Sequence, residues 1–185
     1  MLGHISRKYE SGSFGPGAIS NIPGDPGGKS YGIYQFSLNK GILSRFVDKT
    51  KFIQLKGYVL GSSEFDTYWK QCAKDSDFEL EQEEFAVQLY FVPIRNYADK
   101  YNFPDIEPIN EALFSIAIQH GRWKQLIDKT AEISCVNNVT GLLCNLYSTR
   151  TDYVKSLALP NQIKKNIVNR YIHELQDVLA LRSRV

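Results

Sequence analysis

The part of the sequence that decides the fold is residues 9–36, which read YESGSFGPGAISNIPGDPGGKSYGIYQF. Residues 10–32 hold seven of the 13 glycines and three of the seven prolines of the chain. Because ordering a glycine costs more backbone entropy than ordering any other residue, neither helix nor sheet propensity holds such a stretch in place. Two acids stand out in it, Glu10 at its start and Asp25 within it. Two carboxylates on separate elements are the minimal equipment of a glycosidase, one to donate a proton and one to activate water.

Length and composition bound the class of protein. A chain of 185 residues is long enough for the full core of one domain, and 43% hydrophobic with 12% aromatic residues indicates an ordered globule. The formal net charge of +2 is too small to predict nucleic-acid binding, and it disfavours a polycationic substrate such as chitosan. The start of the chain, residues 1–7, lacks the apolar segment of a signal peptide, and no run is long enough to cross a membrane.

The three cysteines do not have metal-site spacing. Cys135 and Cys144 stand among apolar residues, so the sequence predicts that both are buried and behave as small hydrophobic side chains.

Residues 2–10 are predicted to form a short helix, because Leu2, Ile5 and Tyr9 share one face. Glu10 then projects from the helix C-terminus. The negative end of the helix dipole raises the pKa of a carboxyl group there, which suits a proton donor. The alternative is that Glu10 is a solvated residue of a last helical turn.

Two motifs resemble the core of the lysozyme superfamily, which includes the bacterial lytic transglycosylases. They are Glu-Ser-Gly at residues 10–12 and Ser-Tyr-Gly-Ile-Tyr-Gln at residues 30–35. The connection between them is longer than in those enzymes by the turn at residues 24–28, and this insertion carries Asp25. That form is similar to family 46 chitosanases and to the related muramidases of phages (endolysins) and of type VI secretion spike proteins. Weaker likeness at residues 117–121 and 146–150 extends the resemblance over most of the chain.

The resemblance implies roles for several residues. In such enzymes a helix-borne Glu is the acid and an Asp in a glycine-rich turn is the base, which assigns these roles to Glu10 and Asp25. A hydroxyl residue five positions after the Asp helps to hold the attacking water, and Ser30 matches it. The residues expected to line the substrate site are Tyr31, Tyr34 and Gln35. On turn chemistry alone Asp25 is an ordinary Asp-Pro-Gly turn residue, and the two tyrosines are equally consistent with strand aromatics.

After the loop and a short β element of one or two strands at residues 29–36, the sequence predicts helices nearly throughout. Helical segments are expected around residues 43–47, after residues 62–63, from residue 76 to a kink at Pro93, and over 110–120, 140–157 and 160–182. The segment 110–120 is apolar nearly all round, which predicts a central core helix that ends at His120 and Gly121. In the last helix we expect these side chains to face inward: Ile163, Ile167, Tyr171, Leu175 and Val178.

Arg150 lies on the apolar stripe of the helix predicted at residues 140–157. A guanidinium in that place has to be paired, since an unpaired buried charge is very costly. The resemblance implies that it belongs to an ion-pair network that supports the catalytic Glu. Direct contact would lower the pKa of Glu10 and impair an acid, so we expect a different acid as its main partner. The alternative is that the stem crosses the stripe and the charged head reaches water.

These features predict one domain over residues 1–185 with a mainly helical, lysozyme-like α+β fold of two lobes and a small β element after the first helix. The predicted function is hydrolysis of β-1,4 linkages of peptidoglycan by an inverting muramidase, without metal or organic cofactor. Lytic transglycosylase, chitosanase and a non-catalytic glycan-binding component of a phage or secretion particle are the alternatives.

The expected partners are peptidoglycan glycan strands, with neither nucleic acid nor a membrane-inserted state. We expect a monomer that is made in the bacterial cytoplasm without a signal peptide. A holin or a secretion apparatus would then deliver it to the cell wall.

Overall fold

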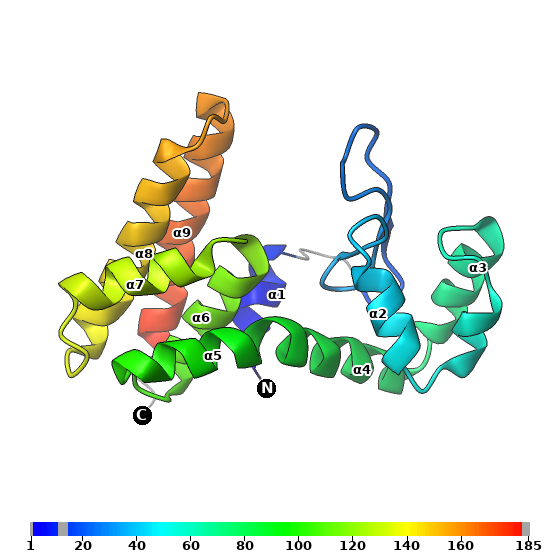
Figure 1. Cartoon of the computed structure of the whole chain (residues 1–185), viewed down its shortest axis with the longest axis horizontal. Helices are drawn as coiled ribbons and strands as arrows, with labels where there is room; N and C mark the ends of the chain where they lie inside the picture. Colours follow the sequence, from blue (N-terminus) through cyan, green and yellow to red (C-terminus); the bar gives the residue numbers. More distant parts are fainter. Residues whose placement is uncertain (1, 11–14, 183–185) are drawn as a thin grey trace. The chain divides into compact units, whose positions relative to one another are not determined.

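The computed structural model describes residues 2–10 and 15–182, and of Glu10 and Arg182 it describes only the backbone (Figure 1). The chain forms two compact units. We call Glu10–Ala86 the loop unit, and Met1–Tyr9 together with Val87–Val185 the helical unit. The chain therefore passes between the units twice, once after α1 (His4–Glu10) begins and once after residue 86.

Within the residues that the structure describes, there are three strands, and all three lie in the loop unit. They are β1 (Ile19–Ser20), β2 (Ser30–Tyr31) and β3 (Phe36–Ser37), paired antiparallel in the order β1-β2-β3. Ile19 lies opposite Tyr31, and Ser30 lies opposite Ser37. The sequence predicted β2 and β3. It did not predict β1, because two residues inside a glycine-rich stretch show no alternation of polar and apolar side chains.

Helices cover the rest of the loop unit. They are α2 (Ile42–Lys49), the 3-10 helix η1 (Ile53–Gly57), α3 (Ser63–Cys72) and α4 (Ser76–Ala86). The core is aromatic: Phe46 and Phe78 pack edge-to-face on Trp69, with ring centroids 5.6 and 4.8 Å away, and Phe85 packs on Phe46 at 5.4 Å. Such pairs stabilise a unit too small to bury many aliphatic side chains.

The helical unit is built around α6 (Glu107–Gln119), where nine of 13 residues are buried. Around it the chain forms the π-helical turn η2 (Val87–Phe91), α5 (Val92–Ala98), the 3-10 turn η3 (Asp99–Tyr101), α7 (Trp123–Ile133), α8 (Val139–Ser156) and α9 (Asn161–Arg182). α7 packs on α8, α8 on α9, and α9 on α6 (Figure 1). The predicted central core helix is therefore confirmed, as are the helices at residues 140–157 and 160–182. The helix α7 was not predicted.

Some predictions need correction. Cys135 and Cys144 are exposed and only Cys72 is buried. Cys135 follows the end of α7, where Ile133 is also exposed, and Cys144 lies on the face of α8 opposite its buried leucine neighbours. Ile163 is 46% exposed, since it lies in the first turn of α9, outside the buried part of that helix. The break expected at Pro93 takes the form of a π-helical turn, which ends two residues before Pro93, and Pro93 itself lies at the start of α5.

Within residues 2–10 and 15–182, no helix combines the length and the hydropathy that a membrane span needs.

Candidate active site

Asp25 lies on the loop between β1 and β2, between two turns, and its side chain is exposed. Its backbone N–H donates to the Ile22 carbonyl at 3.1 Å, and its carbonyl accepts from the Gly28 N–H at 2.9 Å. Its Oδ1 accepts from the Gly27 N–H at 2.7 Å, which is the geometry of an Asx turn. No other described residue donates to this carboxylate. One oxygen therefore fixes the side chain, and Oδ2 remains available to a ligand or a water.

Two glycines set the shape of this loop. Gly24 and Gly28 have φ of 82° and 66°, a left-handed conformation that costs energy for residues with a Cβ. A Cβ on Gly28 would also lie 2.7 Å from the amide of Asn39, whose backbone N–H donates to the Gly27 carbonyl at 3.0 Å. The glycine density that marks the sequence is thus used to hold the turn that carries Asp25.

Ser30 begins β2, five residues after Asp25, and is 9% exposed. Its hydroxyl makes no hydrogen bond to any residue that the structure describes. It is therefore available to a water or a ligand. Its role in holding the attacking water stays a prediction.

The hairpin turn between β2 and β3 holds Gln35 in a left-handed conformation, with φ of 51°. Its Nε2 donates to the carbonyl of Gly32 at 2.8 Å, which stabilises the turn. Non-glycine residues with positive φ are uncommon and concentrate at functional sites. The geometry thus keeps Gln35 as a candidate contact for the substrate.

The two tyrosines are core residues. Tyr31 is completely buried, packs edge-to-face on Trp69, and donates its hydroxyl to Asp66 at 2.5 Å. Burial and the neighbouring Asp66 carboxylate raise its pKa. Tyr34 is 6% exposed, and its ring stacks on Phe36. Burial favours the alternative interpretation of both as strand aromatics over the expectation that they line the substrate site.

Gln82 is a residue that sequence reasoning missed. It lies on α4, is completely buried, and connects two ends of the loop: its Oε1 accepts from the Ile33 N–H and its Nε2 donates to the Pro16 carbonyl, both at 3.0 Å. Trp69 Nε1 donates to the same carbonyl at 3.0 Å. In the sequence Gln82 lies in the acidic segment EQEE at residues 81–84, which is typical of a solvent-exposed helix face. No local pattern therefore indicates that Gln82 is buried and bonded to the loop.

Glu10 is the last residue of α1, which confirms the predicted position at a helix end. Its side chain lies outside the part of the chain that the structure describes, so its role as the acid stays a prediction.

Arg150 is completely buried in the helical unit and paired with Glu174 of α9, Nη1 to Oε2 at 3.0 Å. Its Nη2 donates to Ser115 Oγ at 3.0 Å and to Gln119 Oε1 at 2.8 Å. Burial alone would raise the pKa of Glu174, but Arg150 and Arg170 outweigh it and lower that pKa. The prediction that Arg150 pairs with an acid other than Glu10 is confirmed, and the alternative of a solvated head is wrong.

His120 is buried next to this network, with Nε2 2.8 Å from the hydroxyl of Tyr171. Burial and the charge of Arg150 lower its pKa to about 4, so it is neutral at pH 7. Its backbone ends α6, as predicted.

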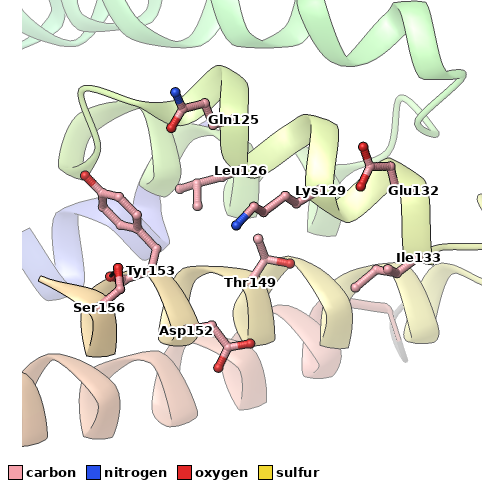
Figure 2. A pocket seen from close by; sticks show the side chains of 9 residues that line it. All are labelled: Gln125, Leu126, Lys129, Glu132, Ile133, Thr149, Asp152, Tyr153 and Ser156. Atoms are coloured by element: carbon pink, nitrogen blue, oxygen red, sulfur yellow. Dashed lines mark hydrogen bonds between the residues drawn. The ribbon is translucent and has the colours of Figure 1, made fainter.

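A groove of about 380 Å³ lies between α7 and α8 in the helical unit (Figure 2). Figure 2 shows its two carboxylates, Glu132 and Asp152, pointing in opposite directions, while Lys129 extends along the groove. The two carboxylates therefore do not face each other across a gap, as the acid and base of a glycosidase do. Among the described residues, no three His, Cys, Asp or Glu side chains are grouped so that they could hold a metal ion.

Sequence and fold comparisons place the chain among known proteins. Residues 2–175 match the family described as type VI secretion system spike protein VgrG3-like, C-terminal. The type VI secretion system spike protein VgrG3 of Vibrio cholerae is 38% identical over 93 residues, which are 49% of this chain and 9% of that protein. The match thus spans less than a tenth of that relative's length.

Two solved structures share the fold. The native chitosanase of Bacillus subtilis MY002 superimposes with a TM-score of 0.61 at 18% identity, over 92% of this chain and 80% of that one. A GH46 chitosanase of Gynuella sunshinyii, solved with chitotetraose, gives 0.60 at 16% identity, over 92% and 81%. At such identities the likeness establishes the fold alone, and it confirms the predicted lysozyme-like α+β architecture.

Proposed function

Since the chain belongs to the family of type VI secretion system spike protein VgrG3-like C-terminal regions, we propose that it is a glycoside hydrolase that cleaves the β-1,4 linkages of peptidoglycan. The observation that carries the proposal is the Asp25 carboxylate, exposed, fixed through one oxygen and five residues before the hydroxyl of Ser30. The fold shared with two chitosanases, one of them solved with a glycan, supports a polysaccharide substrate.

The reaction follows from the two carboxyl groups. Glu10 donates its proton to the glycosidic oxygen as the bond to the anomeric carbon breaks. Asp25 Oδ2 takes a proton from a water that Ser30 helps to hold, and the oxygen of this water attacks the anomeric carbon from the opposite face. The product is a reducing end of inverted configuration, and the two acids regain their starting states after proton exchange with solvent. In an inverting enzyme the carboxyl groups are about 6.5–9.5 Å apart, which leaves room for that water.

Peptidoglycan is favoured over chitosan by charge. The chain has a net charge of +2, which repels a polycation slightly, whereas peptidoglycan carries carboxylates. The family relation to type VI secretion spike proteins supports delivery to the wall by a secretion apparatus rather than by a holin.

Digestion of purified sacculi in ¹⁸O-labelled water, followed by mass spectrometry of the muropeptides, tests this proposal. A hydrolase places one labelled oxygen on each new reducing end, whereas a transglycosylase releases unlabelled anhydro-muropeptides. Chitosan digested in parallel identifies a chitosanase. Binding to sacculi without any soluble product would identify a non-catalytic glycan-binding protein. Unlabelled anhydro-muropeptides, products from chitosan instead of sacculi, or binding without products would each overturn the proposal.

A further inference from the structure

The side chain of Glu111 is a completely buried carboxylate on the central helix α6, and both of its oxygens contact the start of α1. Oε1 accepts from the Gly3 N–H at 2.6 Å and lies 3.1 Å from His4 Nδ1. Oε2 accepts from the Ile5 N–H at 3.1 Å. A carboxylate in an apolar core is costly unless its oxygens are satisfied, so these contacts explain why the fold tolerates it.

The start of α1 needs such a group. The first turn of a helix has N–H groups without a partner, and the positive end of its dipole favours an anion. α1 has no acidic residue in its own first turn, so Glu111, more than 100 residues later in the chain, supplies the carboxylate. Burial raises the pKa of Glu111, against the lowering effect of the Gly3 N–H and of His4.

The other end of α1 is held by Asp177 of α9. Its Oδ2 accepts from the Tyr9 hydroxyl at 2.7 Å and from Lys8 Nζ at 2.6 Å. A helix of seven residues is not stable alone, since isolated helices shorter than about 12–15 residues are marginal in water. These two acids therefore hold the part of α1 that belongs to the helical unit, which ends at Tyr9, directly before Glu10.

We propose that Glu111 is a positioning residue for Glu10: it fixes the start of α1 on α6 and so fixes where the proton donor at the end of α1 stands. Asp177 holds the same helix through Lys8 and Tyr9, the two residues before that donor. This inference rests on the proposed function. Displacement of a catalytic group by about 1 Å costs on the order of 100-fold in rate, so a loosened α1 lowers turnover without changing the groups that bind the glycan.

The experiment compares Glu111→Gln with a matched variant, Glu81→Gln. Glu81 is also a buried helical glutamate whose carboxylate accepts from a backbone N–H, that of Lys51, but it contacts the end of α2 instead of α1. We expect both variants to lower Tm. Only Glu111→Gln should reduce kcat, by tenfold or more with KM within twofold of native, and raise amide hydrogen exchange of residues 3–9.

Asp177→Asn, which changes a side chain that is 30% exposed and is expected to fold, should act in the same direction as Glu111→Gln with a smaller loss of kcat. Native kcat in both α1 variants, despite faster exchange of residues 3–9, would overturn the positioning role. So would an equal loss of kcat in Glu81→Gln. If the native protein releases no glycan products, the proposed function itself fails and the positioning role with it, whereas the exchange data still report whether Glu111 holds α1.

Discussion

Arg150 Nη1 lies 3.0 Å from Glu174 Oε2, and neither side chain has any exposure to solvent. The guanidinium lies over the rings of Tyr147 and Tyr171, 4.8 and 4.1 Å from their centroids. The pair thus joins α8 to α9 in a place where water cannot replace either partner. Such pairs add little over a well-packed apolar core, but removing Arg150 takes one of two cationic partners from the buried Glu174 carboxylate and leaves a cavity beside it.

Arg150→Ala is therefore expected to lower the free energy of unfolding by about 3–5 kcal/mol. Urea denaturation followed by circular dichroism measures the loss. Arg170→Ala is the control, because Arg170 Nε bonds the same carboxylate at 2.6 Å but from a side chain that is 21% exposed, and its loss should be smaller. Equal losses in the two variants would show that the burial of Arg150 does not matter.

Asp25→Asn should reduce turnover on sacculi by about 100-fold or more, because an amide cannot accept the proton of the attacking water. The amide oxygen can still accept from the Gly27 N–H, so the turn is retained. Asp75→Asn is the matched control: Asp75 is exposed, lies in the same unit, and its Oδ1 accepts from the N–H two residues later, at 2.9 Å. Native turnover in Asp25→Asn would remove it as the base.

Glu10→Gln should likewise reduce turnover by about 100-fold or more while leaving the thermal unfolding curve close to native, since it removes only the proton donor. Product release measured by reducing-sugar assay on sacculi gives the turnover. A folded Glu10→Gln protein that lyses cell walls at the native rate would require another acid.

Gly32→Ala is expected to destabilise the loop unit by about 2–4 kcal/mol, the sum of backbone strain at φ of 74° and overpacking. A Cβ there would lie 2.1 Å from Gln82 Oε1, so it would displace the atom that accepts the hydrogen bond from the Ile33 N–H. Gly24→Ala separates the two causes, because Gly24 has φ of 82° but no heavy atom within 4 Å of a built Cβ. Calorimetry should show a lower Tm for Gly32→Ala than for Gly24→Ala, and the reverse order would contradict the packing argument.

The neutral His120 predicts a pH dependence of stability. Its pKa is lowered from 6.5 to about 4, so below pH 6.5 the unfolded chain binds a proton that the folded protein does not. Its contribution to stability is complete above pH 6.5 and is lost as the pH falls toward 4, by about 2 kcal/mol between pH 7.5 and pH 5.0. His120→Gln should lack this part of the decline in urea titrations at the two pH values. The raised pKa of Glu111 acts with the opposite sign, but it is present in both proteins and cancels.

The sequence predicted the helical elements best where their apolar faces are long, as in α6, α8 and α9. It predicted the pairing of Arg150, because a buried guanidinium limits the possibilities, but the identity of Glu174 came from tertiary packing. The sequence does not predict α7, because Gly121 indicates the end of a helix and Arg122, which precedes α7, is not a usual N-cap residue.

The sequence predicts a site residue well when its environment is set by its neighbours in the chain, and poorly when it is set by residues far away in the sequence. Asp25 occupies a turn that its glycine neighbours define, so its exposure could be expected from the sequence. Tyr31 could not be assigned, since its burial depends on Trp69, 38 residues away along the printed sequence. Gln82 and Glu111 act across distances in sequence that no local pattern records.

The two hydrogen bonds that Gln82 makes to the glycine-rich loop divide it into segments that tolerate mutation to different degrees. The backbones of Pro16 and Ile33 are both bonded to Gln82 of α4, so an insertion beside either would break a hydrogen bond that holds the loop. Residues 21–26 are all exposed, and apart from the turn that presents Asp25 they make few contacts with the unit. It follows that related sequences can change side chains at residues 21–23 without disturbing the frame, as long as the Ile22 carbonyl still accepts from the Asp25 N–H. Natural variation of substrate range among relatives should therefore concentrate in that short segment.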